Sequence, residues 1–219
     1  MSPRDNLNVS LSDLHALIKE MGSRAERALH DAVASLKNGD IALAQNIVAD
    51  DIQVNELENK VLELGAKTIA TQQPVAKDMR NIIIAFRIAS DLERMADLAV
   101  DIAKVTIRIN GQSLMKPLVD IPRMAELAGL MIQESMLSYM SEDVELAYKM
   151  AQTDDEVDHL YSQMLRELFV FMLENPQTIN QGMLLCFVGR YLERIADHAT
   201  NIGENVVYLV KGKRPDLNA

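Results

Sequence analysis

The chain has 219 residues, of which 48% are hydrophobic and 25% charged, with only 9 glycines and 6 prolines. These values are typical of a packed globular protein and exclude a disordered chain. The formal net charge of −10 argues against nucleic acid and anionic lipid as partners, because binding either one requires a basic surface. The single cysteine, Cys186, rules out an internal disulfide and suits a reducing compartment.

The first residues, Met1–Asn8, lack the apolar segment of a secretory signal. No run of about 18 apolar residues follows, so we expect no direct membrane insertion. Together with the unpaired cysteine, these features predict a cytoplasmic protein.

Helical periodicity dominates the chain, and turn residues interrupt it at a few points. The pattern predicts an all-α fold of six helices, over Ser10–Lys37, Asp40–Thr71, Ala76–Asn110, Pro122–Met140, Glu142–Glu174 and Ile179–Val210. Thr178 and Gln181 have the spacing of a capping box at the start of the last helix. The tail from Gly212 onward is expected to be loose.

The six helices form two similar sets of three. Asp91–Ile102 (DLERMADLAVDI) aligns with Tyr191–Ile202 (YLERIADHATNI), with seven of twelve positions identical. The first two helices of each set align with a shift of 103 residues, and the third helices align with a shift of 100. The sequence therefore predicts two tandem three-helix bundles, residues 1–113 and 114–219.

Each third helix carries a row of acidic or amide side chains at intervals of four residues. Such spacing places the row on one stripe of a helix, opposite the apolar residues, so these side chains are expected to face outward. The rows are Glu93, Asp97 and Asp101 in the first half, and Glu193, Asp197 and Asn201 in the second.

The second helix of each half adds further polar groups on one face. These are Asp51, Asn55 and Glu58 in the first half, and Asp154, Asp158 and Tyr161 in the second. If the second and third helices are neighbours, their oxygen ligands line one outer groove in each half. Carboxylates without His or Cys suit hard cations such as Mg²⁺, Mn²⁺, Ca²⁺ or iron.

Two other interpretations of the acidic rows remain open. The rows would be only a solvated surface if the protein is a purely structural bundle. Alternatively, the protein would be a di-metal enzyme, since Glu156 and His159 have the ExxH spacing of ferritin-like sites. Only one such motif occurs, however, and an enzyme would require its carboxylates in a dry core pocket.

The paired LERxAD segments, Leu92–Asp97 and Leu192–Asp197, resemble the ExxxD motifs of the PhoU family of bacterial phosphate-signalling regulators. The segments Gln73–Arg80 and Asp51–Glu58 are similar to other parts of that family, and the likeness spans about Leu11 to Lys213. This resemblance implies a cytoplasmic, non-enzymatic adaptor that is often a homodimer and restrains the phosphate-starvation response. The partners it implies are the ATPase subunit of the phosphate ABC transporter and a sensor histidine kinase.

The resemblance also implies metal binding at Glu93 with Asp97, and at Glu193 with Asp197. The two rows differ, because Asn201 replaces an acid and Tyr161 stands where the first half has Glu58. We therefore expect the first row to be the better set of cation ligands. The methionine-rich stretch Met115–Met150 is a candidate for the dimer contact.

Overall fold

The computed structural model describes residues 3–213 and 215–217. Helices account for nearly all of this part of the chain, which contains no strand. The all-α prediction is therefore confirmed. The helices are α1 (Pro3–Asn38), α2 (Ile41–Asp50), α3 (Ile52–Gln72), α4 (Lys77–Ile109), α5 (Asp120–Ser141), α6 (Val144–Ala151), α7 (Asp154–Glu174) and α8 (Ile179–Lys211), with a short 3₁₀ turn, η1 (Pro176–Thr178), before α8.

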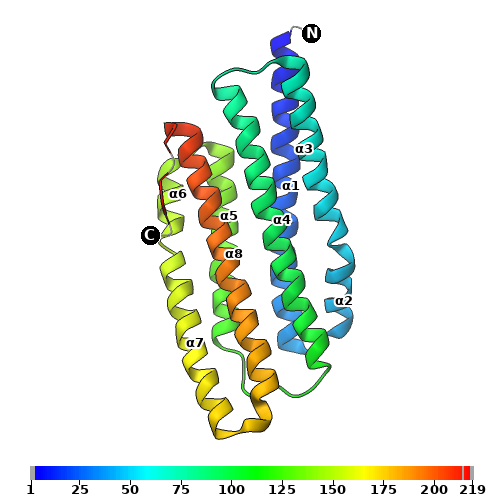
Figure 1. Ribbon diagram of the computed structural model, residues 1–219, viewed down its shortest axis with the longest axis vertical. Coiled ribbons are helices and arrows are strands. Elements are labelled where there is room, and N and C mark those ends of the chain that lie inside the picture. Colours follow the sequence, from blue (N-terminus) through cyan, green and yellow to red (C-terminus); the bar gives the residue numbers. More distant parts are fainter. Residues whose placement is uncertain (1–2, 214, 218–219) are drawn as a thin grey trace.

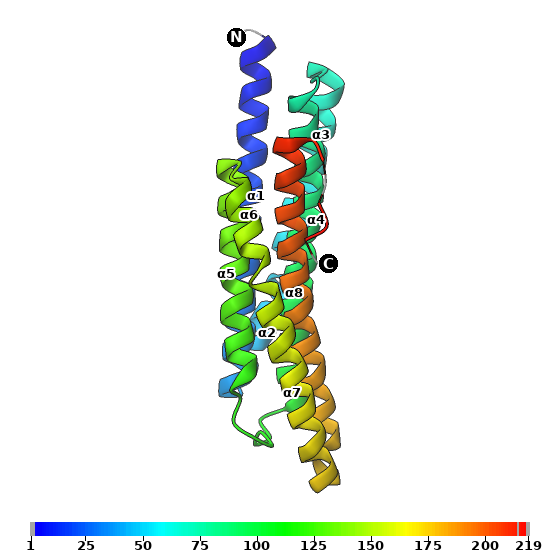
Figure 2. The same ribbon diagram turned by 90° about the vertical axis from the view of Figure 1, so that its left-hand side faces the viewer.

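Four long helices form the centre of the molecule. Helix α4 packs along α1 and α8, and α8 in turn packs along α5, which also contacts α1. Helices α2 and α3 cover one flank of this group, while α6 and α7 cover the other (Figure 1). Seen from the side, α1 and α5 make one layer and α4 and α8 the other (Figure 2). One hydrophobic cluster runs through both halves, so they pack as a single body.

The second and fifth predicted helices are each broken in two, which the sequence pattern did not predict. The breaks fall at Asp51, between α2 and α3, and at Gln152–Thr153, between α6 and α7. Asp51 and Asp154 are equivalent under the 103-residue shift, so the break is part of the duplicated design. The caps are duplicated as well, because Asp40 accepts a hydrogen bond from Leu43 N at 2.9 Å and Asp143 accepts one from Leu146 N at 3.1 Å.

The predicted capping box at the start of α8 is wrong. Thr178 forms no side-chain cap; instead Asn175 caps the 3₁₀ turn, and Gln181 binds the backbone of Ser113 and Met115. The expected looseness of the tail from Gly212 stays a prediction. Among its described residues, the Leu217 backbone N–H donates to the buried Glu204 at 3.0 Å, and residues 214, 218 and 219 lie outside the described part of the chain.

Polar contacts join the start of α4 to the end of α8. Arg80, near the start of α4, donates to the carbonyls of Tyr208 and Leu209 at the end of α8, at 3.3 and 3.1 Å. The guanidinium also lies 5.6 Å from the Tyr208 ring centroid. Tyr208 O also accepts from Gly212 N at 2.9 Å, so Arg80 adds a second donor there, and at Leu209 O it binds one of the carbonyls in the last turn of α8. The contacts join the two halves.

Candidate functional site: two acidic grooves

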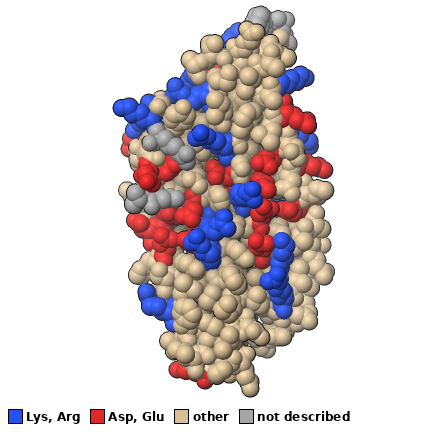
Figure 3. Space-filling model, in the orientation of Figure 1, with Lys and Arg blue, Asp and Glu red and all other residues tan. Residues whose placement is uncertain are grey.

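The structure brings each predicted acidic row next to the carboxylates of the preceding helix. Helix α3 packs beside α4 and α7 beside α8. We call the resulting groups the first acidic cluster (Asp51, Asn55, Glu58, Glu93, Asp97 and Asp101) and the second acidic cluster (Asp154, Asp158, Glu193, Asp197 and Asn201). Acidic side chains gather across the middle of the face that α4 and α8 share (Figure 3).

These side chains are less exposed than an outward-facing stripe would be. The side chains of Glu93 and Glu193 are only 15% and 13% exposed, and Asp154 is buried. The expectation that the rows face outward is therefore wrong for Glu93 and Glu193. The neighbouring helix covers part of the stripe, so each row lies along the contact between two helices, which we call an acidic groove.

In the first acidic cluster, Asp51 lies where α2 gives way to α3. Its Oδ2 accepts a hydrogen bond from the Asn55 amide at 3.3 Å. Burial raises the pKa of Asp51 above its ordinary value, and the negative charge of Asp97 raises it further. Burial and Asp97 likewise raise the pKa of Glu93.

Basic side chains compensate the charge of the first acidic cluster. Lys104 Nζ lies 2.9 Å from Asp101, and Arg94 lies 3.4 Å from Glu93 and 3.5 Å from Asp97. Each carboxylate of the predicted first row therefore has a cation on its own helix.

The second acidic cluster has less compensation. Burial raises the pKa of Asp154 from 3.8 to about 7, and the charge of Asp197 adds to the effect. The pKa values of Asp158 and Glu193 are also raised, mainly by burial and then by Asp197. Arg190 forms an ion pair with Glu193. Within the described residues, no Lys or Arg forms an ion pair with Asp154, Asp158 or Asp197.

Several oxygen atoms in both clusters are buried without a hydrogen-bond partner among the described residues. They are Asp51 Oδ1, Asn55 Oδ1, Asp154 Oδ1 and Glu193 Oε2. Unsatisfied buried carboxylate oxygens are costly, and a bound cation would remove that cost. The donor atoms thus fit a hard cation by chemistry. As the described side chains stand, however, no three His, Cys, Asp or Glu groups are gathered closely enough to hold a metal ion.

The remaining predicted residues lie at the margins of the grooves. Asn201 is half-buried, and no hydrogen bond in the described part of the chain joins it to the second acidic cluster. His159 of the ExxH motif is exposed. His198 turns away from Asp197 and lies 3.0 Å from Asp91 of α4, across the contact between the two halves. Sequence reasoning missed this pair, because it depends on the antiparallel register of α4 and α8.

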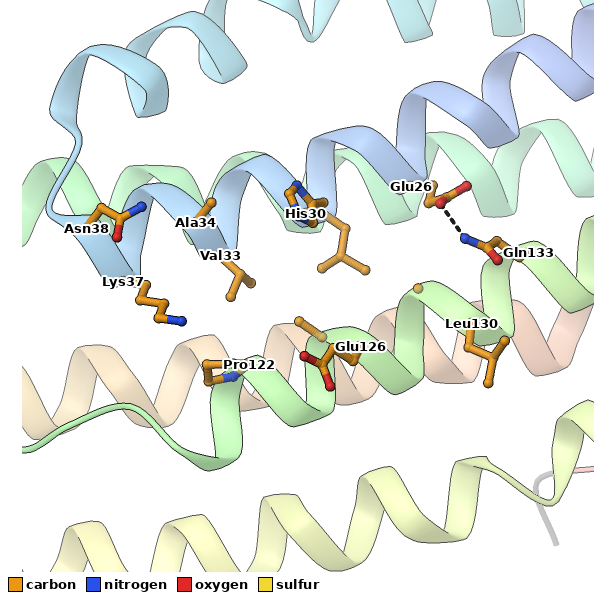
Figure 4. A pocket seen from close by; sticks show the side chains of 13 residues that line it. Glu26, His30, Val33, Ala34, Lys37, Asn38, Pro122, Glu126, Leu130 and Gln133 are labelled. Atoms are coloured by element: carbon orange, nitrogen blue, oxygen red, sulfur yellow. Dashed lines mark hydrogen bonds between the residues drawn. The ribbon is translucent and has the colours of Figure 1, made fainter.

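A separate hollow of about 570 Å³ lies between α1 and α5 (Figure 4). Its lining mixes apolar side chains with charged ones such as Glu26, which accepts a hydrogen bond from Gln133 at 2.5 Å. None of the predicted acidic residues contributes to it, so it is not part of either acidic groove.

Fold and site together define a duplicated three-helix-bundle protein with one half-buried acidic groove in each half. The PhoU domain model matches residues 18–106 and 121–206, one match in each half. The chain belongs to the PhoU family.

Relatives and solved structures support this membership. The chain is 40% identical over 214 residues to the phosphate-specific transport system accessory protein PhoU homolog of Clostridium acetobutylicum, covering 95% of each chain. The crystal structure of PhoU from Pseudomonas aeruginosa matches with a TM-score of 0.90 and 35% identity, over 94% of this chain and 99% of that one. The phosphate transport system regulatory protein PhoU from Streptococcus pneumoniae matches with a TM-score of 0.89 and 25% identity, covering 96% and 99%. No helix in the described part of the chain is long and apolar enough to cross a membrane.

Proposed function

We propose that this protein is a regulatory adaptor of phosphate homeostasis that keeps the phosphate-starvation response off when phosphate is plentiful. The observation that carries the proposal is family membership over nearly the whole chain, with relatives named as accessory or regulatory proteins of phosphate transport. The adaptor acts in the cytoplasm and works by binding. It links the ATPase subunit of the phosphate ABC transporter to a sensor histidine kinase, and it functions as a homodimer.

An adaptor changes the activity of a kinase only if it binds the two conformations of the kinase with different affinity. The long exposed faces of this bundle offer surface for that purpose, and the net charge of −10 favours basic surfaces on the partners. The acidic grooves supply a second input, because a cation bound there would reverse the local charge that a partner meets.

The candidate cation ligands are Asp51, Asn55, Glu93, Asp97 and Asp101 in the first half, and Asp154, Asp158, Glu193, Asp197 and Asn201 in the second. Unsatisfied buried oxygens and raised pKa values in both clusters support this assignment. Oxygen ligands alone favour Mg²⁺, Mn²⁺, Ca²⁺ or iron over Zn²⁺ and copper. A bound cation would provide positive charge that lets these carboxylates ionise together.

The structure gives less support to a di-metal enzyme. His159 of the ExxH motif is exposed, and the carboxylates lie in half-open grooves rather than in an enclosed core pocket. An adaptor with a cation-dependent surface accounts for this placement without a catalytic step.

Deletion of the gene tests the regulatory role. The deletion strain should produce high alkaline phosphatase in phosphate-rich medium, and a plasmid copy of the gene should restore the low level. Low alkaline phosphatase in the deletion strain would contradict the regulatory role.

Calorimetric titration of chelator-treated protein tests the cation sites independently. Mn²⁺, Mg²⁺, Ca²⁺ or Fe²⁺ should produce a saturable binding heat. If none of the four ions produces such a heat at neutral pH, the cation proposal is wrong. The regulatory role is tested separately, by the deletion strain.

A further inference from the structure

The α7–α8 hairpin carries a patch of large apolar side chains that face solvent. We call it the apolar hairpin patch; its members are 44% to 82% exposed and comprise Phe169, Val170 and Leu173 of α7 and Ile179, Met183 and Phe187 of α8. The hairpin projects beyond the ends of the neighbouring helices at the lower end of the molecule (Figure 1). An exposed apolar patch of this extent marks an interaction surface.

The first half shows that the fold itself does not require these side chains. Its equivalent positions on α3 and α4 are mostly small or charged: Ala66, Lys67, Ala70, Met79, Ile83 and Arg87. Both hairpins pack onto their own half with similar buried residues, such as Leu57 and Leu160. At four of the six positions the large apolar side chain is therefore found only in the second hairpin, on its solvent side.

Electrostatics favours this end of the molecule for contact between two copies. A chain with a net charge of −10 repels its own copy, and the acidic grooves concentrate that charge at mid-height. On the face shown in Figure 3, the lower end around the α7–α8 hairpin displays few charged side chains. Because salt screens exposed charges beyond roughly 8–10 Å, two copies that meet at this end avoid most of the repulsion.

The spacing of residues along α7 and α8 also allows the patch to pair with the same patch of a second copy. Met164 lies against Gly189 and Met172 against Gly182, so Val170 of α7 and Met183 of α8 are at about the same level. Met183 lies midway between Ile179 and Phe187, and Val170 lies midway between Arg166 and Glu174. A two-fold axis at this level would place Phe187 near the partner copy's equivalent of Ile179, and Arg166 near the equivalent of Glu174.

We propose that the apolar hairpin patch binds a second copy of this chain, with the two α7–α8 hairpins packed antiparallel as four helices. This names the interface of the homodimer in the proposed function and rests on that part of it. A whole aromatic side chain has roughly 150–250 Å² of surface. The six side chains are each about half exposed or more, so together they present on the order of 600 Å² of apolar surface. With a polar rim, that approaches the approximately 800 Å² per partner of a stable interface.

The methionine-rich stretch offers a poorer interface. Met124, Met131 and Met150 are completely buried and belong to the shared core. The contact predicted from Met115–Met150 therefore has few of its methionines available to a partner.

Sedimentation velocity and light scattering on the full chain test the proposal. At about 10–100 µM, a range that covers weak interfaces of this size, wild type should have twice the chain mass of 24.5 kDa. Met183→Asp should shift the mass to that of one chain, because the new carboxylate would be buried against its own copy. The matched control is Ile83→Asp at the equivalent position of α4, which is also exposed and should leave the dimer intact.

Three results would overturn the proposal. They are a wild-type monomer over this range, a dimer that survives both Met183→Asp and Phe187→Asp, or a dimer that Ile83→Asp dissociates. A wild-type monomer that instead binds zwitterionic phospholipid vesicles would assign the patch to a membrane. Conversely, reversal of charge at Arg166 and at Glu174 should each weaken the dimer, and R166E together with E174R should restore it. Titrating the monomeric variant with cations tests the cation sites independently of the dimer contact.

Discussion

The two acidic clusters occupy equivalent places in a duplicated fold, yet they differ in countercharge. In the first, Lys104 and Arg94 lie within 3.5 Å of all three row carboxylates. In the second, the position of Lys104 is taken by Glu204, whose side chain accepts a hydrogen bond from Leu217. The duplication has thus preserved Asp51, Glu93 and Asp97 as Asp154, Glu193 and Asp197, while the lysine that pairs with Asp101 has no counterpart in the second half.

Countercharge and burial bear on cation affinity as much as the number of acids does. The sequence favoured the first row, because Asn201 replaces an acid in the second. In the structure, the second cluster holds Asp154, whose pKa is raised to about 7, together with fewer ion pairs. A cation that enters this cluster displaces no lysine and relieves a larger electrostatic cost. We therefore expect the second cluster to bind cations more tightly.

The largest expected effect is on cation affinity when Asp154 is replaced. Asp154→Asn should weaken binding of Mn²⁺ to the second cluster by about 10- to 100-fold, because it removes a charged ligand from a site with few countercharges. Asp51→Asn, the equivalent change, should weaken the first cluster by only about threefold, or roughly 0.7 kcal/mol. Calorimetry at pH 8 measures both, with the exposed Asp155→Asn as control. A larger loss from Asp51→Asn would reverse the comparison.

A smaller effect is expected on the pH dependence of folding. The folded-state pKa of Asp154, about 7, lies above the ordinary value of 3.8, so the folded protein holds this proton more tightly than the unfolded chain does. The resulting stabilisation is fully present below about pH 4 and is lost as the pH rises to about 7, on the order of 2 kcal/mol in metal-free protein. Asp154→Asn should remove this loss and be more stable than wild type at pH 8.

Urea unfolding at several pH values between 4 and 8 measures this difference. The advantage of Asp154→Asn should shrink steadily as the pH falls. Parallel profiles for the two proteins would show that Asp154 ionises normally in the fold. The same proton competes with cations, so wild-type affinity should fall as the pH drops below about 7.

Local pattern predicted most of the fold. The third helices were predicted correctly because helical spacing and the LERxAD repeat are properties of neighbouring residues. The breaks at Asp51 and at Gln152–Thr153 were missed because neither contains Gly or Pro, and the backbone stays in the helical region there.

Contacts between distant segments were harder to predict. The pairing of Asp91 with His198 and the capping of α8 by Arg80 both require the antiparallel register of α4 and α8. The burial of Glu93 and Glu193 depends on how closely α3 and α7 cover the stripe. In contrast, the ion pair of Lys104 with Asp101 joins neighbours at i,i+3 spacing, a kind of contact that a sequence can indicate although it was not predicted here.

The smallest expected effect on cation affinity comes from replacing Lys104, a lysine that the second half lacks. Lys104→Ala should raise the affinity of the first cluster for Mn²⁺ by about threefold, because the entering cation no longer competes with the ammonium group at Asp101. The gain is small since both side chains of this pair are exposed, at 49% and 40%, and water screens their attraction. Lys60→Ala, an exposed lysine of α3 with no ion pair among the described residues, serves as control. If Lys104→Ala leaves cation affinity unchanged or lowers it, countercharge is not what separates the two clusters, and burial of Asp154 alone must account for their difference.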